Sequence, residues 1–224
     1  MKDQWWTAEN LKGLYEKFEE SDEHRFDKLD KDHDAGSYRL MRLGGSISDA
    51  KLKYHNDTFT AYKIKFCKGL LNNNNLPKRI LDAGCGTGRL MFQIQNMGKI
   101  SGFDFRDTAL TYCRKRNLNN LQKVDLNSWD PVESQFDFII SLDVISDKGI
   151  LDDKLIVKKF YKALKPGGKL IMHIPAFPFL KRKHDQGATI KKRYLKNELK
   201  EIARWTGFTP ICIKYRLFFA TPIF

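Results

Sequence analysis

The stretch LDAGCGTGRL, residues 81–90, places three glycines at every second position directly after a short apolar run that ends in a carboxylate. Gly84, Gly86 and Gly88 can adopt positive φ angles, and without side chains they let a ligand approach the backbone closely. A helix that begins after them offers unpaired N–H groups to a carboxylate or phosphate. The stretch therefore predicts a ligand-binding turn between a strand and a helix.

Around this turn and beyond it, short β-rich runs alternate with helical segments over about 100 residues, from Lys78 onward. Such alternation is typical of an α/β fold with a parallel sheet covered on both faces. The predicted strands are RILDAG, KISGFD, LQKVDL, FDFIISLD, KLIMHIP and PICIKYRL, and the predicted helices span residues 88–97, 108–116, 152–164 and 195–205.

Two amphipathic helices are expected before the first strand. The first begins after Thr7, a favourable N-cap residue, and the second spans about residues 57–71. We therefore expect a helical cap or lid in residues 1–75 and a core in residues 76–224, with a loop insertion around residues 175–194. The apolar faces of the two helices comprise Leu11, Leu14, Tyr15 and Phe18 in the first, and Phe59, Tyr62, Phe66 and Leu70 in the second.

The four cysteines, at positions 67, 85, 113 and 212, are widely spaced. They form no CxxC or Cys/His cluster typical of a zinc site or a disulfide framework, so we expect reduced thiols and no metal. The N-terminus MKDQWWTAEN lacks the apolar run of a signal peptide, and no stretch approaches the roughly 18 apolar residues of a membrane span. These features predict a cytoplasmic protein without a membrane span.

The net charge of +13 is concentrated in the C-terminal third. Residues 1–34 hold 11 Asp and Glu against 6 Lys and Arg, whereas residues 158–216 hold 16 Lys and Arg against 3 Asp and Glu. A basic region of this kind attracts nucleic acid, an anionic membrane surface or a phosphorylated or carboxylated metabolite. The alternative is that these lysines lie on solvated helix faces.

A carboxylate on the next predicted strand narrows the choice of ligand for the glycine turn. Asp104 lies 20 residues past Gly84, at the end of the second strand, where a carboxylate can hold both ribose hydroxyls. A dinucleotide and S-adenosylmethionine both carry such a ribose. The spacing here is GxGxG, whereas a dinucleotide turn of the form GxGxxG places its last glycine one residue later, so NAD is disfavoured.

The complete set of motifs resembles the class I S-adenosylmethionine-dependent methyltransferases, whose first motif reads like LDxGCGTG. The resemblance covers about residues 78–216. It implies an α/β, Rossmann-like, doubly wound, mostly parallel sheet of six or seven strands with added N-terminal helices. It also implies S-adenosylmethionine as cofactor and S-adenosylhomocysteine as its product.

The resemblance assigns the first two predicted strands to cofactor binding. Asp82, the acidic residue two positions before the first glycine, and the turn 84–88 would receive the methionine part of the cofactor. Cys85 belongs to this turn and is expected to be a small filler rather than a nucleophile. Asp104 would hold the ribose, and Phe105 would pack on the adenine.

The resemblance extends the same ligand site to the next two strands. In KVDLNSW, Asp125 and Leu126 match the place where the family contacts the adenine edge. In FDFIISLD, Ser141, Leu142 and Asp143 match the fourth motif, beside the transferred methyl group.

The segment PAFPFLKRKHDQGATIKKRYLKNEL, residues 175–199, resembles a type 11/12 methyltransferase subgroup with a segment like PAFPFLWSxHDxxxGHxRRYxxxEL. The second histidine of that pattern is missing, and Ile190 and Lys191 occupy its neighbourhood. A role that depends on that histidine therefore cannot be transferred to this chain.

Methyl transfer from a sulfonium is an in-line displacement, so alignment of the acceptor supplies most of the acceleration. A side chain that takes the proton of an oxygen or amine acceptor adds to it. The predicted catalytic residues are His184, Asp143 and Tyr194. His173 and Asp185 are further candidates near the carboxyl ends of the fourth and fifth strands, although a histidine inside an apolar strand, like His173, is more often a hydrogen-bonded core residue. The predicted acceptor-binding residues are Tyr15, Phe18, Phe177, Asp185 and Arg193.

The predicted reaction is methylation of an O or N atom of a small, polar or anionic metabolite, such as a secondary metabolite or a sugar or lipid-linked precursor. An RNA or DNA methyltransferase is the main alternative because of the basic C-terminal third, but the fourth motif SLDV differs from the NPPY or DPPY of base-amino methylating enzymes. A catalytically inactive scaffold that still binds the cofactor is a second alternative. A monomer and a homodimer both remain open.

Overall fold

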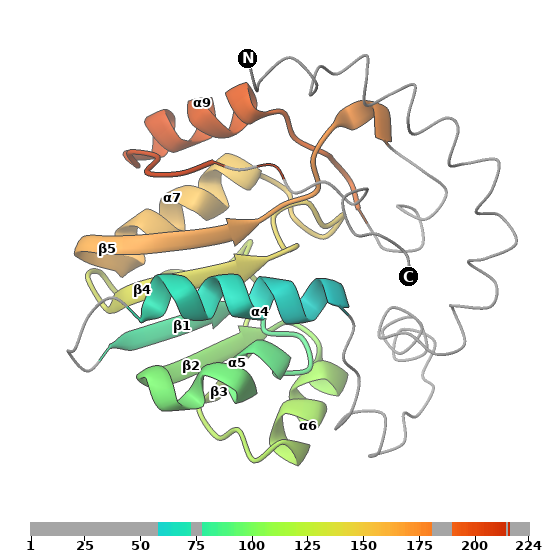
Figure 1. The fold of residues 1–224 in the computed structure, drawn as a ribbon, viewed down its shortest axis with the longest axis vertical. Coiled ribbons are helices and arrows are strands. Elements are labelled where there is room, and N and C mark those ends of the chain that lie inside the picture. Colours follow the sequence, from blue (N-terminus) through green and yellow to red (C-terminus); the bar gives the residue numbers. More distant parts are fainter. Residues whose placement is uncertain (1–57, 73–77, 181–189, 214, 216–224) are drawn as a thin grey trace, which may run out of the picture.

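The computed structural model describes residues 58–72, 78–180, 190–213 and 215, with side chains from Ile64 onward. Its centre is a five-stranded sheet in the order β3-β2-β1-β4-β5, in which all neighbouring strands are parallel (Figure 1). The strands are β1 (Arg79–Ala83), β2 (Lys99–Asp104), β3 (Leu121–Lys123), β4 (Phe136–Leu142) and β5 (Leu164–His173).

From β1 the chain adds β2 and then β3 on one side of β1, and it then adds β4 and β5 on the other side of β1. This order places a topological switch point between β1 and β4, and open α/β sheets bind ligands outside the carboxyl ends of the strands at such a point. The helix α4 (Thr58–Leu71) precedes the sheet, and η2 (Pro178–Leu180) and α9 (Lys196–Thr206) follow it. The helices and 3₁₀ turn between strands are α5 (Arg89–Ile94), η1 (Gln95–Met97), α6 (Asp107–Lys115) and α7 (Asp153–Ala163).

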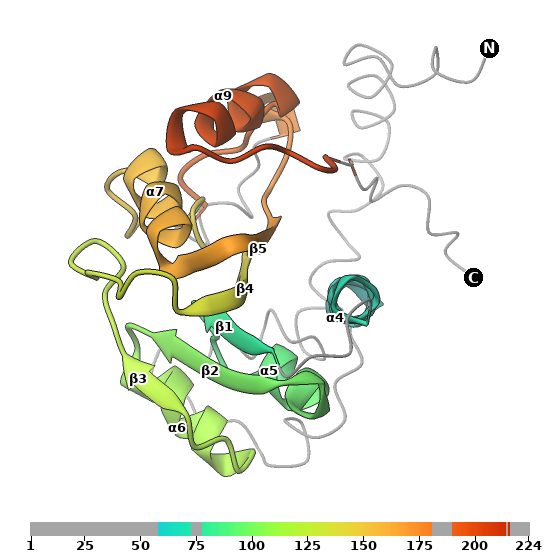
Figure 2. The same ribbon diagram turned by 90° about the vertical axis from the view of Figure 1, so that its left-hand side faces the viewer.

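The three central strands, β1, β2 and β4, are mostly buried on both faces because their side chains alternate between two helical layers. Ile80 of β1 and its register partner Phe138 of β4 pack with α4, α5 and α6 on one face. Leu81 and its partner Ile139 pack with α7 and α9 on the other face. Figure 2 shows the two layers, with α4 and α5 on one side of the sheet and α7 and α9 on the opposite side.

The helix ends follow ordinary capping chemistry. The side chain of Asp152 accepts a hydrogen bond from the backbone N–H of Leu155 at 3.0 Å and begins α7. Glu198 accepts from the backbone N–H of Leu195 at 2.7 Å at the start of α9. Gly207, with φ of 95°, ends α9 in the left-handed conformation that favours glycine.

The predicted fold class, the parallel sheet and the predicted helices from residue 57 onward are confirmed, with helix ends displaced by at most three residues. The helix predicted after Thr7 lies outside the described residues. The predicted count of six or seven strands was too high. The described part of the chain has five, and residues 210–213 and 215 of the expected sixth strand form no strand. β-branched and aromatic residues supply propensity, but a strand also needs a paired neighbour, and that segment has none among the described residues.

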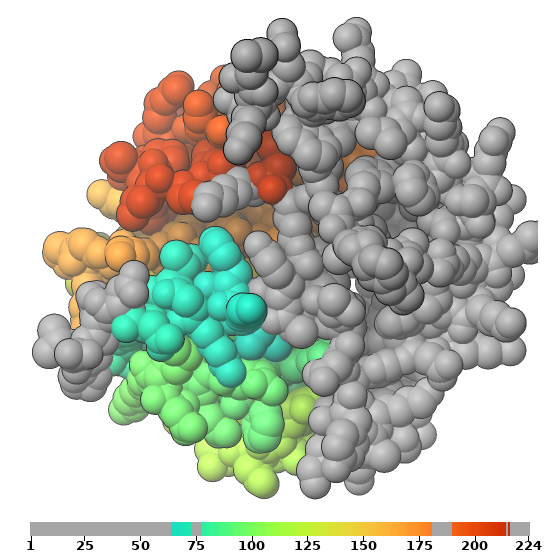
Figure 3. Space-filling model, in the orientation of Figure 1, coloured from blue at the N-terminus to red at the C-terminus, as the bar shows by residue number. Residues whose placement is uncertain are grey.

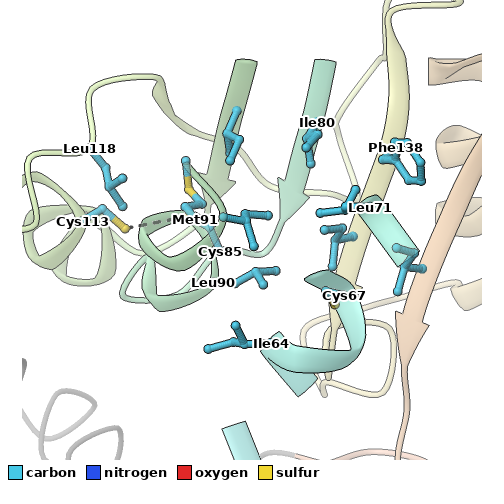
Figure 4. Packing of buried hydrophobic residues seen from close by; sticks show 14 of the residues in the cluster. Ile64, Cys67, Leu71, Ile80, Cys85, Leu90, Met91, Cys113, Leu118 and Phe138 are labelled. Carbon is cyan, nitrogen blue, oxygen red and sulfur yellow. Dashed lines mark hydrogen bonds between the residues drawn. The ribbon is translucent and has the colours of Figure 1, made fainter. Parts of the chain in front are cut away.

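The predicted inward face of α4 was also wrong. Ile64, Cys67 and Leu71 are buried against the sheet, whereas Phe66 and Leu70 are 42% and 40% exposed. Figure 4 shows the buried set beside Ile80 and Phe138, and Figure 3 shows α4 lying at the surface next to α5. Of the expected N-terminal cap, only α4 lies within the described residues. No helix in the described part of the chain is long and apolar enough to cross a membrane.

Candidate active site

The glycine turn after β1 has the backbone conformation that the sequence predicts. Gly84, Gly86 and Gly88 have φ angles of 80°, 53° and 74°. The absence of side chains is required mainly by the protein itself. A Cβ atom on Gly84 would lie 2.5 Å from Cγ2 of Val144, and one on Gly88 would lie 2.5 Å from Cδ1 of Leu118. Two of the three glycines therefore allow neighbouring loops to pack against the turn.

Backbone hydrogen bonds fasten the turn to the end of β2. The N–H groups of Gly84 and Cys85 both donate to the carbonyl oxygen of Phe103 at 2.9 Å. The N–H of Gly86 donates to Oδ2 of Asp104 at 3.0 Å. The structure thus brings together the turn and the acidic residue that the sequence predicts to share one ligand.

Asp104 is buried, with 4% of its surface exposed, and is held in a fixed orientation. Its Oδ1 accepts from the backbone N–H of Arg106 at 3.0 Å and from the Nε of the same residue at 3.3 Å. A carboxylate has about four acceptor positions, and these contacts with the contact from Gly86 use three of them. The next residue, Phe105, is 56% exposed, and its ring lies 5.0 Å from the Arg106 guanidinium. Sequence reasoning missed Arg106, which has no fixed place in the motif.

Asp82 is the most unusual group at this edge of the sheet. It is 2% exposed, and its Oδ2 has no hydrogen-bond partner among the described residues. Burial and, to a smaller extent, the negative charge of Asp104 together raise the pKa of Asp82 to about 7. Buried polar atoms are normally hydrogen-bonded, so an unpartnered carboxyl oxygen indicates a place for a ligand.

Cys85 and Cys113 lie directly beneath the turn. Their Sγ atoms are 4.0 Å apart, and Cys113 donates to the carbonyl oxygen of Gly86 at 3.2 Å (Figure 4). The hydrogen bond with Cys113 and the burial of the thiol both raise the pKa of Cys85 strongly. A thiol that resists ionisation is a poor nucleophile, which supports the expected filler role.

The predicted adenine-edge and fourth-motif residues reach the same edge of the sheet. Asp125 accepts two hydrogen bonds from Asn127, through its backbone N–H and its Nδ2, both at 2.9 Å, and Leu126 is buried. Ser141 is 2% exposed and its Oγ has no partner among the described residues. It follows Ile140, the register partner of Asp82, so its side chain points to the opposite face of the sheet.

The carboxyl ends of β4 and β5 carry an Asp–His pair. Oδ1 of Asp143 lies 2.6 Å from Nδ1 of His173, and the backbone N–H of Asp143 donates to the His173 carbonyl oxygen at 2.8 Å. The expectation that His173 is a core histidine was wrong, because its side chain is 28% exposed and contacts a carboxylate. Its only sequence signal was a histidine at the end of a predicted strand.

Tyr194 is 1% exposed, and its hydroxyl donates to Oδ2 of Asp153 at 2.7 Å. Burial and this hydrogen bond raise its pKa. This placement supports a structural role for Tyr194 rather than the predicted catalytic one.

Two predicted acceptor-binding residues are engaged inside the protein. Phe177 is buried, and its ring stacks on Tyr215 with the ring centroids 4.6 Å apart. Arg193 donates from Nη1 to the carbonyl oxygen of Ala176 at 3.0 Å. The remaining predicted site residues lie outside the described part of the chain: Tyr15, Phe18, His184 and Asp185.

A family model described as "Methyltransferase domain" matches residues 75–207. A ubiquinone biosynthesis O-methyltransferase of Idiomarina loihiensis is 32% identical over 100 residues, which cover 42% of this chain and 40% of that protein. A demethylmenaquinone methyltransferase of a Geobacillus species is 26% identical over 170 residues, which cover 70% of this chain and 64% of that protein. The chain thus spans less than two thirds of the length of both relatives.

Among solved structures, phosphoethanolamine N-methyltransferase 2 of Haemonchus contortus, in complex with phosphomonomethylethanolamine and S-adenosylhomocysteine, is similar in fold. The TM-score is 0.55 at 21% sequence identity, and the match covers 65% of this chain and 36% of that chain. This likeness supports the fold. The family match, which spans more than half of the chain, together with the β1 turn and its two acids, shows that the chain belongs to the methyltransferase-domain family.

Proposed function

We propose that this chain binds S-adenosylmethionine at the turn after β1 and transfers its methyl group to an O or N atom of a small, polar acceptor. When bound, this cofactor supplies an electrophilic methyl group on a sulfonium that leaves as a neutral thioether. The proposal rests above all on the buried carboxyl of Asp82 beside the glycine turn, whose Oδ2 has no hydrogen-bond partner among the described residues.

The charge of this site distinguishes between the two ligand classes that the sequence left open. Asp82 and Asp104 are both carboxyl groups, both buried, and close enough for one to raise the pKa of the other. The pyrophosphate of a dinucleotide would place further negative charge beside them, which is strongly unfavourable in a buried site. A ligand with a sulfonium and an α-ammonium group supplies the opposite charge. The two acids therefore favour S-adenosylmethionine over NAD.

The positions of Asp82, Asp104 and Phe105 are consistent with the contacts to the cofactor that the family resemblance implies for each of them. Asp82 would accept from the α-ammonium group of the methionine part, which gives its unpartnered Oδ2 a donor. Asp104 would use its remaining acceptor position for a ribose hydroxyl, while its bonds to Gly86 and Arg106 hold it in place. The exposed ring of Phe105 would pack on the adenine, which removes apolar surface from water.

The names of the relatives support a small acceptor molecule. The charges of the described residues give less support for an anionic one. The two curated relatives are named a ubiquinone biosynthesis O-methyltransferase and a demethylmenaquinone methyltransferase, and the Haemonchus contortus enzyme was solved with phosphomonomethylethanolamine. The basic cluster 191–193 offers no such support, because Lys191 donates to the carbonyl oxygen of Ile150 and Lys192 pairs with Asp153. The other basic cluster of this segment, residues 181–183, lies outside the described part of the chain.

Calorimetry tests the proposal without knowledge of the acceptor. The full chain should bind S-adenosylmethionine and S-adenosylhomocysteine, and Asp104→Asn should weaken both by about 10- to 100-fold, the equivalent of one lost charge-assisted hydrogen bond. Asp82→Asn should weaken S-adenosylmethionine similarly. Asp130→Asn is the matched control, because Asp130 is 89% exposed and pairs only with Lys162 among the described residues. Folded protein that binds neither compound would overturn the proposal.

A further inference from the structure

We propose that His173 is the group that takes the proton from the methyl acceptor and that Asp143 holds its imidazole in the tautomer this requires. This inference rests on the proposed function. The sequence offered His173 as one of five candidates for the proton acceptor and favoured His184. The structure instead assigns the proton-accepting role to a histidine at the end of β5.

The contact between the two side chains is short and anchored by the backbone. Oδ1 of Asp143 and Nδ1 of His173 are 2.6 Å apart, the distance of a strong, charge-assisted hydrogen bond. Strand register brings the residues together, since Leu142 is the partner of His173 across β4 and β5 and Asp143 follows it. The Asp143 N–H donates to the His173 carbonyl oxygen at 2.8 Å. Backbone and side-chain contacts thus hold the same pair.

Asp143 adopts a conformation that costs energy. Its φ angle is +62°, in the left-handed region that few residues other than glycine occupy. Such a residue costs on the order of 1 kcal/mol, and these conformations are found most often at functional sites. Here the bend at Asp143 ends β4 and keeps its carboxylate beside His173 rather than continuing along the strand.

The pair adjoins the proposed cofactor turn. Val144, the residue after Asp143, lies against Gly84 so closely that a Cβ on this glycine would be 2.5 Å from Cγ2 of Val144. His173 is also in register with Leu142, two residues beyond Ile140, which is the partner of Asp82. Because side chains alternate along strands, His173 and Asp82 project from the same face of the sheet.

The two side chains are accessible to a ligand, unlike Asp82 and Tyr194. His173 is 28% exposed and Asp143 is 39% exposed. Asp82 is 2% exposed and Tyr194 is 1% exposed, with its hydroxyl already bound to Asp153. Of these four side chains, the Asp143–His173 pair therefore provides an imidazole that a ligand can reach.

The chemistry follows from the tautomer. A carboxylate accepts hydrogen bonds, so Nδ1 of His173 carries the proton that it donates to Asp143, and the basic lone pair is on Nε2. A lone pair of the acceptor atom forms the new bond to the methyl carbon as the carbon–sulfur bond breaks, and the acceptor's proton passes to Nε2. Asp143 stabilises the resulting imidazolium, which then releases the proton to water.

Kinetics of the full chain test the step with 3,4-dihydroxybenzoate as the probe, because its phenolic hydroxyls lose a proton on methylation. His173→Gln should lower turnover by about 100-fold or more while the affinity for S-adenosylmethionine stays within about twofold. Asp143→Asn should lower turnover by about tenfold, since an amide does not stabilise an imidazolium. Asp130→Asn should match the wild type. Free imidazole should partly restore turnover to His173→Ala, which would not occur for a purely structural residue.

A second measurement needs no acceptor. Nitrogen NMR of the full chain labelled with ¹⁵N-histidine, with the His173→Gln variant as the assignment control, reports which ring nitrogen carries the proton. At about pH 8 we expect a protonated Nδ1 and an unprotonated Nε2 at His173, and loss of this preference in Asp143→Asn.

The outcomes separate the two proposals. Failure to bind S-adenosylmethionine overturns the proposed function. Binding together with an unchanged turnover of His173→Gln on the probe overturns the role of His173 alone. If the wild type does not methylate the probe, the tautomer decides: a protonated Nε2 and an unprotonated Nδ1 would overturn the role of His173, and the opposite state supports it.

Discussion

Asp82→Asn should make the protein more stable at neutral and alkaline pH while weakening its binding of S-adenosylmethionine. The carboxyl of Asp82 is 2% exposed, and its Oδ2 has no hydrogen-bond partner among the described residues. Ionisation of such a group inside the protein is unfavourable because burial removes it from water and Asp104 repels it. An asparagine has nearly the same shape and does not ionise.

The expected size follows from the shift in pKa. The carboxyl has a pKa of 3.8 in the unfolded chain and about 7 in the folded protein. Between these values the folded state holds a proton that the unfolded state has lost, so the free energy of unfolding falls as pH rises from about 4 and levels off above about 7. At 1.36 kcal/mol per pKa unit, the loss is about 4 kcal/mol in all and about 2 to 3 kcal/mol between pH 5 and pH 8.

Urea unfolding of both proteins at these two pH values measures the effect. The difference in free energy of unfolding between Asp82→Asn and the wild type should shift in favour of the variant by about 2 to 3 kcal/mol from pH 5 to pH 8. All other titrating groups are common to both proteins and cancel in this difference. The control Asp130→Asn should show no such shift, because its side chain is 89% exposed. The same pH dependence in Asp82→Asn and the wild type would refute the reasoning.

Three further substitutions test individual contacts. Gly88→Ala should lower the free energy of unfolding by about 1 to 3 kcal/mol in urea titration, because Gly88 has a φ of 74° and its new Cβ would lie 2.5 Å from Leu118. Tyr194→Phe should lower it by about 1 to 2 kcal/mol through loss of the bond to Asp153, while calorimetry shows unchanged cofactor affinity. Phe105→Ala should weaken S-adenosylmethionine binding by about tenfold in calorimetry and leave stability unchanged, because its ring is 56% exposed.

Much of the fold and part of the site could be predicted because both depend on local patterns. The strand before the glycine turn, the turn itself and Asp104 lie close together in sequence, and the required backbone angles select glycine. The helices followed from apolar spacing and capping residues. These predictions needed no knowledge of which strands are neighbours.

The inward face of α4 could not be read in this way. The helix carries two apolar stripes, one with Phe66 and Leu70 and the other with Ile64, Cys67 and Leu71. The apolar periodicity of either stripe predicts a helix. Which stripe is buried depends on how the helix fits against the surface of the sheet. The smaller residues fit against Ile80 and Phe138, while the larger aromatic stripe remains outward.

The reason for the glycines was also not local. Gly84 is bare because Val144, 60 residues further along the chain, packs on it, and Gly88 is bare because Leu118 does. The glycine motif predicts that side chains are not tolerated at these positions. It does not predict whether a ligand or another part of the protein fills the space. In this protein the neighbouring loops occupy much of the space that the sequence alone would give to a ligand.

The carboxyl groups of Asp82 and Asp143 lie in different environments, and we infer different roles for them from this difference. Asp82 is buried and lacks a hydrogen-bond partner on Oδ2 among the described residues, so it favours the neutral form until a cation is bound beside it. Asp143 is half-exposed and bonded to a histidine, so its charge can support a proton on the imidazole. Acid and base assignments in enzymes commonly follow from such contrasts. The sequence supplies both acids, but His173 joins Asp143 only through the register of β4 and β5, 30 residues apart in the chain.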